Sequence, residues 1–366
     1  MIYLDHAATT PVCDAAKKAI IEHLDDFGNP SSSYEFGRKS RLLIEDAREL
    51  IAKYINCEPD ELYFTSGGSE ANSWALHKLR SLSSPIEHHS ARGNERCAIV
   101  DSDGFINVDS LDYAINCHGL LGVPDIVSCM LVNNEIGTIQ PIKQMRPIIA
   151  DNSISLHVDG VQAAGHIPVD VKDLGCRSFS MSAHKFGGIK GVGTLYINHI
   201  YKDLMYPLIK GGKQEFGERP GTENILGIIS MAAALEDSVK HMEERNKHTK
   251  HLRDKMLDKL LQIPDSHLNG SLENRVASNI NIRFDGVSGS RLVALCDLYD
   301  ICISAGSACN EGNPQPSHVL KAIGLSDEEA LSSVRITLGH ENTEEEIDVA
   351  ADIITKLVER IRHEKD

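Results

Sequence analysis

Residues 156–188, LHVDGVQAAGHIPVDVKDLGCRSFSMSAHKFGG, decide the fold of this chain. They contain two short apolar runs, Leu156–Val158 and Phe179–Met181, and each is followed by polar residues and glycine. Turn and helical segments separate the two runs. Apolar strands that alternate with helices are typical of a mainly parallel sheet covered on both faces. The stretch therefore predicts an α/β protein.

The same pattern continues on both sides of this stretch. Helical periodicity is clear at Arg38–Asn56, where apolar residues recur on one face. A glycine-containing turn, 66–69, follows an apolar strand and begins a helix that runs to Leu79. Further strands are expected at Glu61–Thr65, Cys97–Val100, Ile126–Val132 and Gly193–Ile197.

The C-terminal third predicts a second unit. A chain of 366 residues exceeds one average domain. From Asn224, which is suited to cap a helix, the pattern stays helical to about Leu261, long enough to bridge two lobes. We therefore predict a large domain over residues 12–242 and a smaller α+β domain formed by 1–11 and 243–366. The smaller domain is expected to contain strands at Asn279–Arg283, Ile301–Ser304 and Val334–Leu338, a helix at Ser290–Leu298 and a final helix from Thr343.

Composition limits the partners. The formal net charge is −16, and such a surface repels phosphate backbones and anionic lipid, so neither nucleic acid nor a membrane is expected as a partner. Aromatic residues make up only 5%, which argues against stacking of single-stranded nucleic acid. The first residues lack the pattern of a secretory signal, and no apolar run is long enough to span a bilayer.

Cysteine usage indicates free thiols. Nine cysteines, none in a CxxC pair, predict neither a disulfide framework nor a structural zinc site, so no metal is expected. The expected compartment is a reducing cytoplasm.

Two positions favour binding of a phosphorylated ligand at the ends of strands. The turn Thr65–Ser69 joins a strand to a helix, where glycines and free N–H groups suit an anion, although a plain tight turn would look the same. Asp159 closes a buried strand and faces the crevice where open α/β sheets bind ligands. The alternative for Asp159 is a helix cap.

Two further residues could carry covalent chemistry. Lys185 lies just beyond an apolar strand, where desolvation or nearby cations can lower the pKa of an amine enough for a Schiff base. Most lysines are only solvated charges. Cys309 follows a strand within a stretch rich in Gly, Asn and Pro, a setting that suits an exposed, reactive thiol, whereas Cys302 lies within a strand and suits packing.

Taken in chain order, the sequence resembles the cysteine desulfurases of iron–sulfur assembly, which are fold-type-I pyridoxal-phosphate enzymes similar to class V aminotransferases. The resemblance implies a seven-stranded, mainly parallel sheet in the large domain and a mobile cysteine loop over about 305–316. It rests on YLDHAATTP (3–11), GNPSS (28–32), FTSGGSEAN (64–72), EHHS (87–90), VNNEIGT (132–138), HVDGVQAAG (157–165), SMSAHKFGGIKGVG (180–193), ERPGTEN (218–224), SAGSAC (304–309), SHVLKAIG (317–324) and VRITLGHENTEEEID (334–348).

The resemblance assigns a role to each site residue. Lys185 would hold pyridoxal 5'-phosphate covalently, and Asp159 would pair with the pyridine nitrogen and make the ring an electron sink. Arg335 would fork onto the carboxylate of the L-cysteine substrate, and Cys309 would take the sulfur as a persulfide. The other implied contacts are Gln162 to the ring hydroxyl, His88 stacked on the ring, Gly68, Ser69, Ser182 and His184 on the phosphate, Thr222 on the phosphate from the neighbouring subunit of a homodimer, and Asn134 on both the cofactor and the substrate.

The sequence departs from the family pattern in three places. Tyr34 stands where histidine is usual, and His340 stands where arginine is common. The region from about Lys78 to Arg96 is shorter than expected, which leaves His89 as an alternative to His88 for the ring-stacking position.

Other functions stay open from the sequence alone. A selenocysteine lyase or an aminotransferase could use the same scaffold, although an aminotransferase has no use for Cys309. A sulfur-carrier scaffold without turnover is the alternative of a different class. The acceptor of the sulfur could be an iron–sulfur scaffold protein or a tRNA-thiolation relay.

Overall fold

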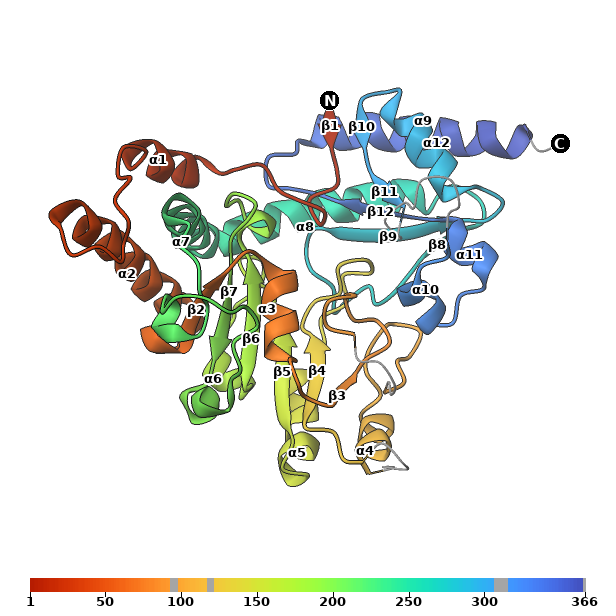
Figure 1. Cartoon of the computed structure of the whole chain (residues 1–366). Helices are drawn as coiled ribbons and strands as arrows, with labels where there is room; N and C mark the ends of the chain where they lie inside the picture. Colours follow the sequence, from red (N-terminus) through yellow and green to blue (C-terminus); the bar gives the residue numbers. More distant parts are fainter. Residues whose placement is uncertain (93–97, 117–121, 306–314, 365–366) are drawn as a thin grey trace.

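The structure is a computed structural model, and it describes residues 1–92, 98–116, 122–305 and 315–364. Its centre is a six-stranded sheet in the order β2 (Leu62–Thr65), β7 (Gly193–Ile197), β6 (Ser178–Ser182), β5 (Ser155–Asp159), β4 (Ile126–Met130) and β3 (Ser81–Ser83) (Figure 1). Strands β3 to β6 are parallel, and β7 runs antiparallel to both of its neighbours. The predicted α/β class with a mainly parallel sheet is confirmed.

The described sheet has six strands where seven were expected. The predicted strand at Cys97–Val100 is wrong for residues 98–100, because the chain turns at Gly104 and folds back on itself. Val100 therefore forms only an isolated bridge with Ile106, and the Asn107 N–H donates to the Ile99 carbonyl. Cys97 lies outside the described residues.

Helices cover the sheet, and most of them share one core with it. All five residues of β4, β5, β6 and β7 are buried, as expected for strands with both faces covered. The covering helices are α1 (Asp14–Glu22), α2 (Glu35–Ile55), α3 (Gly68–Ala75), α4 (Val108–Asn116), α5 (Ile142–Asp151), α6 (Val171–Leu174) and α7 (Ile225–Lys240). All of these helices share the core of the sheet except α3, which packs in a smaller separate cluster. Among the described helices, none is both long and apolar enough to cross a bilayer.

The long helix predicted from Asn224 to Leu261 is wrong as a single element. The Asn224 side chain does cap α7, since its Oδ1 accepts the Gly227 N–H at 3.1 Å. The helix stops at His241, which has φ −106° and ψ 9°, and α8 (Met242–Leu260) starts anew. The break separates two packing roles: α7 is buried in the core of the large sheet, whereas α8 buries Leu252, Met256 and Leu260 in a second core.

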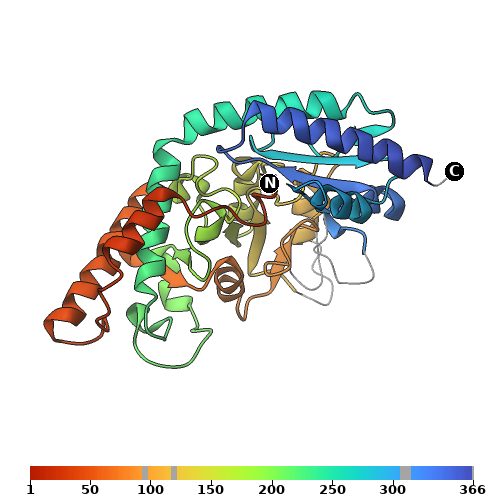
Figure 2. The ribbon, with the colours of Figure 1, turned by 90° about the horizontal axis from the view of Figure 1, so that it is seen from above.

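A four-stranded antiparallel sheet forms the second unit. Its order is β11 (Ser304–Ala305), β12 (Ser333–Thr337), β9 (Asn279–Phe284) and β8 (Ser266–Leu268), and β1 (Ile2–Tyr3) pairs with β10 (Ile301–Cys302) beside it. Helices α8 and α12 (Glu344–His363) lie side by side along one face (Figure 2), and α9 (Gly289–Asp297) packs against β10, β11, β12 and α12. Two short helices, α10 (His318–Ala322) and α11 (Asp327–Leu331), lead into β12.

We propose that these two cores correspond to the two domains predicted near a boundary at residue 243. The proposal is supported by the helix break at His241. Two short helices cross the division, because Val319 and Leu320 of α10 and Ala330 of α11 pack into the core of the large sheet.

Candidate active site

The carboxyl ends of the strands bring the predicted site residues together. Asp159 is the last residue of β5, and Lys185 follows the end of β6 by three residues. The antiparallel strand β7 places Gly193 opposite both Thr65 and Ser182, so the turn after β2 meets the end of β6. One edge of the sheet therefore carries the glycine turn, the carboxylate and the lysine.

Asp159 is a buried carboxylate held by hydrogen bonds. Its side chain accepts from Asn72 Nδ2 at 2.7 Å and from the Val161 N–H at 3.0 Å. Asn72 Oδ1 in turn lies 3.0 Å from Nε2 of His157, whose pKa is lowered to about 4 by burial. The neutral His157 ring donates its Nε2 proton to Asn72 Oδ1. This bond fixes the amide so that its NH2 group faces Asp159. The network orients the carboxylate toward the crevice.

Removing the Asn72 amide is expected to weaken cofactor binding. Asn72→Leu keeps the volume but leaves buried atoms of Asp159 and His157 without a partner. A hydrogen bond to a charged group contributes about 1.5–3 kcal/mol, which corresponds to a roughly 10–100-fold loss of affinity. Fluorescence titration of the apoprotein with the cofactor measures this change. Asn116→Leu is the control because, among the described residues, the Asn116 side chain bonds to Asp112 of its own helix. Equal affinities in the two variants would contradict the role of Asn72.

Lys185 carries an amine with an unusually low pKa. Its Nζ donates to the carbonyls of Ala7 at 2.6 Å and Ala8 at 2.8 Å. Burial and, after it, the positive charge of Arg335 lower the pKa to about 8, although Asp5 and Asp159 act in the opposite direction. The neutral, nucleophilic amine is therefore accessible near physiological pH.

The pH dependence of Lys185 reactivity tests this property directly. In the cofactor-free protein, acetylation of Lys185 by acetic anhydride is expected to rise with a midpoint near pH 8, because only the neutral amine reacts. Ordinary lysines have a pKa of about 10.4. Mass spectrometry of the Lys185 peptide over a pH series gives the midpoint. Arg335→Gln should move it upward, since a repelling charge is removed, and a midpoint near 10 in the unaltered protein would contradict the assignment.

His88 lies on the side of the site facing Asp159. Its Nδ1 is 2.7 Å from Ser90 Oγ, and that oxygen accepts from Asn72 Nδ2 at 3.0 Å. Burial lowers the pKa of His88, and the charge of Asp159 opposes that shift. The alternative residue His89 is turned elsewhere, with its ring centroid 4.8 Å from that of His318. This placement favours His88 over His89 as the ring-stacking residue, and that role stays a prediction.

The turn before α3 forms a cradle that side chains would fill. A Cβ on Gly68 would lie 2.5 Å from Val161 Cγ2, and one on Gly193 would lie 2.7 Å from the Gly67 Cα. Gly67 also has φ +153°, which favours glycine. Behind the turn, Glu70 accepts the Ser66 N–H at 2.7 Å and pairs with Arg219 at 2.9 Å. Free N–H groups and hydroxyls at a helix start fit a phosphate group.

The remaining cofactor residues flank this cradle. Ser182 Oγ would lie 3.6 Å from a Cβ on Gly67, and Ser69 is in the first turn of α3. His184 Nδ1 is 3.1 Å from Thr9 Oγ1, and burial lowers the pKa of its ring to about 4. Gln162 Nε2 donates at 2.9 Å to the same Ala7 carbonyl that accepts from Lys185.

Arg335 has the geometry of a carboxylate clamp. Its guanidinium is buried, pairs with Asp5 Oδ1 at 2.8 Å and donates to the Asn134 carbonyl at 3.0 Å. Its Nε has no partner within the described part of the chain. Asn134 thus contacts this clamp through its backbone carbonyl, and its roles at the cofactor and the substrate stay predictions. A buried guanidinium of this kind suits the carboxylate of an amino acid.

Two predicted residues are not placed in this cluster. Thr222 is exposed on the loop before α7. Cys309 lies outside the described residues, which end at Ala305 and resume at Gln315. Sequence reasoning missed Asn72, although it lies in the quoted FTSGGSEAN motif, and it missed the partner of Arg335, Asp5, in YLDHAATTP.

Comparison with known proteins shows the family of this chain. The family model for aminotransferase class-V matches residues 2–349. Cysteine desulfurase IscS of Methanosarcina thermophila is 39% identical over 99% of this chain and 93% of its own length, and that of Dictyoglomus turgidum is 40% identical over 99% and 95%. The X-ray structure of a NifS-like protein from Rickettsia africae is 29% identical, with a TM-score of 0.90 over 98% of this chain and 99% of that one.

This chain belongs to the class-V aminotransferase family. Within it, the chain is one of the cysteine desulfurases, which depend on pyridoxal phosphate. The site described above fits that cofactor: it offers a phosphate cradle, a buried carboxylate for the pyridine nitrogen and an amine with a lowered pKa.

Proposed function

We propose that the protein converts L-cysteine to L-alanine and transfers the sulfur to Cys309 as a persulfide. The observation that carries the proposal is the Lys185 amine, with a pKa of about 8, on the same sheet edge as the buried Asp159 carboxylate and beside the Arg335 clamp. Pyridoxal phosphate, when bound, withdraws electrons from the substrate Cα.

Different residues of the chain would hold different groups of the cofactor. Asp159 would pair with the pyridine nitrogen, and His88 would cover the ring. Gln162 would bond the ring hydroxyl, with Asn134 nearby. The phosphate would lie among Gly68, Ser69, Ser182 and His184.

Two residues act on the substrate itself. Arg335 binds the carboxylate of cysteine and orients the amino acid. Once released by the substrate amine, the neutral Lys185 Nζ takes the proton from Cα, because its lowered pKa matches a general base near pH 8. The same amine can return that proton later in the reaction.

Sulfur transfer requires a reactive thiol. The Cys309 thiolate attacks the substrate sulfur: an S–S bond forms on the enzyme, the C–S bond of the substrate breaks, and Cβ gains a proton to give alanine. No external oxidant is needed. The six described cysteines are poor candidates, because burial raises the pKa of each thiol: Cys13, Cys57, Cys129, Cys176, Cys296 and Cys302.

The ends of the segment that carries Cys309 lie at the site, which supports its role. Ser304 pairs with Arg335 across β11 and β12. On the other side, Ser317 Oγ donates at 2.5 Å to Glu135, the neighbour of Asn134. The pKa of Glu135 is raised to about 7 by burial. The described residues on either side of this segment therefore contact Arg335 and the neighbour of Asn134.

A homodimer is supported by an apolar surface on α1, α2 and the loop between them. Phe27 is 80% exposed and stacks on the 58% exposed Phe36, with ring centroids 5.6 Å apart. Ile21, Leu24 and Leu42 are also exposed there. Exposed apolar clusters of this kind mark interaction sites. The exposed Thr222 could then reach the phosphate of the second subunit.

Charge reversal on this surface tests the dimer. Phe27→Asp combined with Phe36→Asp is expected to shift the protein from dimer to monomer in sedimentation analysis, because burying two carboxylates in an interface is costly. Leu298→Asp, on an exposed residue elsewhere, is the control and should leave the mass unchanged. A dimer that survives the double substitution would place the interface elsewhere.

An acceptor protein in iron–sulfur cluster assembly or tRNA thiolation is proposed from the family resemblance. The six described cysteines are free thiols, which supports a reducing cytoplasm as the compartment.

Product analysis tests the proposed reaction. With cysteine and a reducing thiol, the purified holoenzyme is expected to release alanine and sulfide in equal amounts. A keto acid would indicate an aminotransferase, and turnover of selenocysteine but not cysteine would indicate a selenocysteine lyase. A holoenzyme that loses its cofactor absorbance when cysteine is added, but releases no sulfide, would favour a carrier scaffold.

A further inference from the structure

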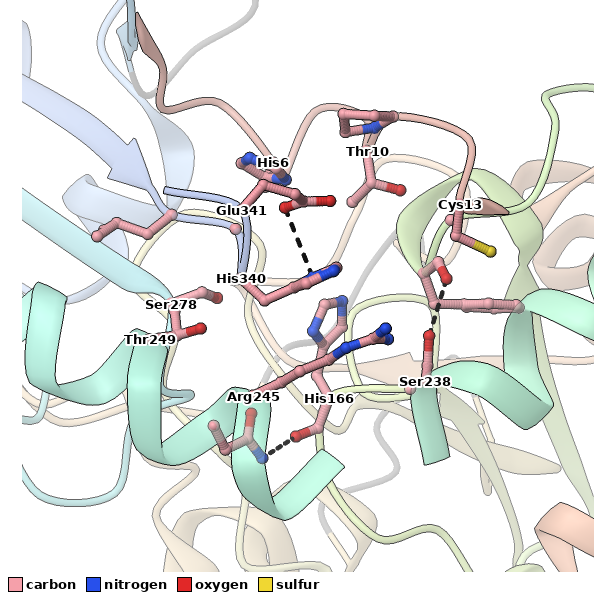
Figure 3. Close-up of a pocket in the computed structure, with 17 residues that line it drawn as sticks. His6, Thr10, Cys13, His166, Ser238, Arg245, Thr249, Ser278, His340 and Glu341 are labelled. Atoms are coloured by element: carbon pink, nitrogen blue, oxygen red, sulfur yellow. Dashed lines mark hydrogen bonds and ion pairs between the residues drawn. The ribbon is translucent and has the colours of Figure 1, made fainter. Parts of the chain in front are cut away.

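A second pocket lies next to the segments that carry the catalytic lysine. It encloses about 70 Å3 and is walled by the N-terminal segment, residues 165–166 and 186–187, α8 and residues 338–341 (Figure 3). We call it the His166 pocket, after a residue that also contacts the active-site chain: His166 Nε2 donates to the Lys185 carbonyl at 2.9 Å. None of the residues assigned to the cofactor or the substrate lines it.

The pocket presents one positive and one negative side chain. Arg245 enters from α8, and its NH2 group pairs with Asp237 at 2.8 Å. On the opposite wall Glu341 has a carboxylate oxygen 3.5 Å from Nδ1 of His340. Figure 3 shows Arg245, His166 and His340 turned toward one open space, with Glu341 nearby. Such a lining balances the two charges of a zwitterion.

His166 provides a hydrogen-bond acceptor, because the tautomer of its ring is defined. The Lys185 carbonyl can only accept, so the proton of His166 is on Nε2. Burial lowers the pKa of this ring, with smaller contributions from the charges of Lys185 and His340, and the neutral ring keeps a free lone pair on Nδ1. A lone pair suits an ammonium group better than an anion.

The arrangement depends on glycine and leaves a small apolar wall. A Cβ on Gly339 would lie 2.2 Å from the ring of His6 and 2.4 Å from a Glu341 oxygen, so only glycine permits these two side chains to approach. Cys13 and Phe186 line the other side. This wall offers contact to a methyl or thiol group.

We propose that the His166 pocket is a second binding site for a small zwitterionic α-amino acid. Its carboxylate would bind Arg245, its ammonium group would bind Glu341 and His166, and its short side chain would face Cys13. A water needs about 10–15 Å3 of such volume, so the pocket holds a molecule of about six non-hydrogen atoms, the size of alanine. The inference is independent of the proposed reaction, although cysteine and alanine belong to this class.

Equilibrium dialysis of the holoenzyme with radiolabelled L-alanine tests the site. Two molecules are expected per chain, one in the active site and one in the His166 pocket. Arg335→Gln should abolish the first, and Arg245→Gln should weaken the second at least tenfold. Lys247→Gln removes an equal charge from the same helix outside this pocket and should change neither.

Glu341→Gln alters the opposite wall of the pocket. It provides a second, independent test in case Arg245→Gln does not fold. It should also weaken the second binding event at least tenfold, while cofactor absorbance stays normal in both variants. Glycine and cysteine should compete with alanine, whereas acetate, which lacks the ammonium group, should not. A single molecule bound per chain, or two that survive both substitutions, would overturn the proposal. Failure of the proposed reaction would appear separately, as absent sulfide with normal two-site binding.

Discussion

Lys185→Ala is expected to lose both covalent attachment of the cofactor and measurable alanine formation, by at least ~10³-fold in rate. The variant lacks the amine that anchors the cofactor and also the base that takes the Cα proton. Buried Asp159 and the phosphate cradle stay in place, so some cofactor should still bind noncovalently. Absorbance after desalting and an alanine assay measure the two losses.

The matched control for this substitution is Lys190→Ala. Lys190 is an exposed lysine five residues further along the chain. It should keep full absorbance and activity. If Lys185→Ala retained more than about a tenth of the rate, another base would have to serve, and the roles assigned to Lys185 would fail.

Cys309→Ala is expected to separate cofactor chemistry from sulfur transfer. The variant should keep the cofactor and show the absorbance change on adding cysteine, because Lys185, Asp159 and Arg335 are unaltered. Alanine formation without added thiol should fall by at least ~10²-fold, since no enzyme thiolate can attack the substrate sulfur. Persulfide labelling followed by mass spectrometry should find none.

Cys302→Ala provides the comparison for that result. Cys302 lies in β10, and burial raises its pKa, so it should not contribute a thiolate. Its loss should leave persulfide formation intact. Normal desulfuration by Cys309→Ala without added thiol would show that a different thiol accepts the sulfur.

The sequence predicted the cofactor site well where strand ends determine positions. Asp159 ends β5, and Lys185 comes three residues after β6. These two strands are parallel neighbours, so their carboxyl ends meet at one edge of the sheet. The glycine turn before α3 joins them because β7 inserts between β2 and β6. Local pattern and sheet geometry together were sufficient there.

Contacts set by tertiary packing could not be predicted in this way. Asn72 is a mid-helix residue whose two-sided bonding to Asp159 and His157 depends on how α3 packs on the sheet. The Ala7 and Ala8 carbonyls that hold Lys185 are backbone atoms of a segment nearly 180 residues away, and carry no side-chain signal. The break at His241 was hidden because both halves of the predicted helix have helical patterns.

Chemical reduction of the holoenzyme followed by peptide mapping tests the central claim most directly. Borohydride fixes the cofactor on whichever amine holds it, and digestion with mass spectrometry then identifies the peptide. We expect a single modified peptide that contains Lys185 and is absent from Lys185→Ala. Modification of another lysine, or a coloured protein that borohydride leaves unlabelled, would contradict it.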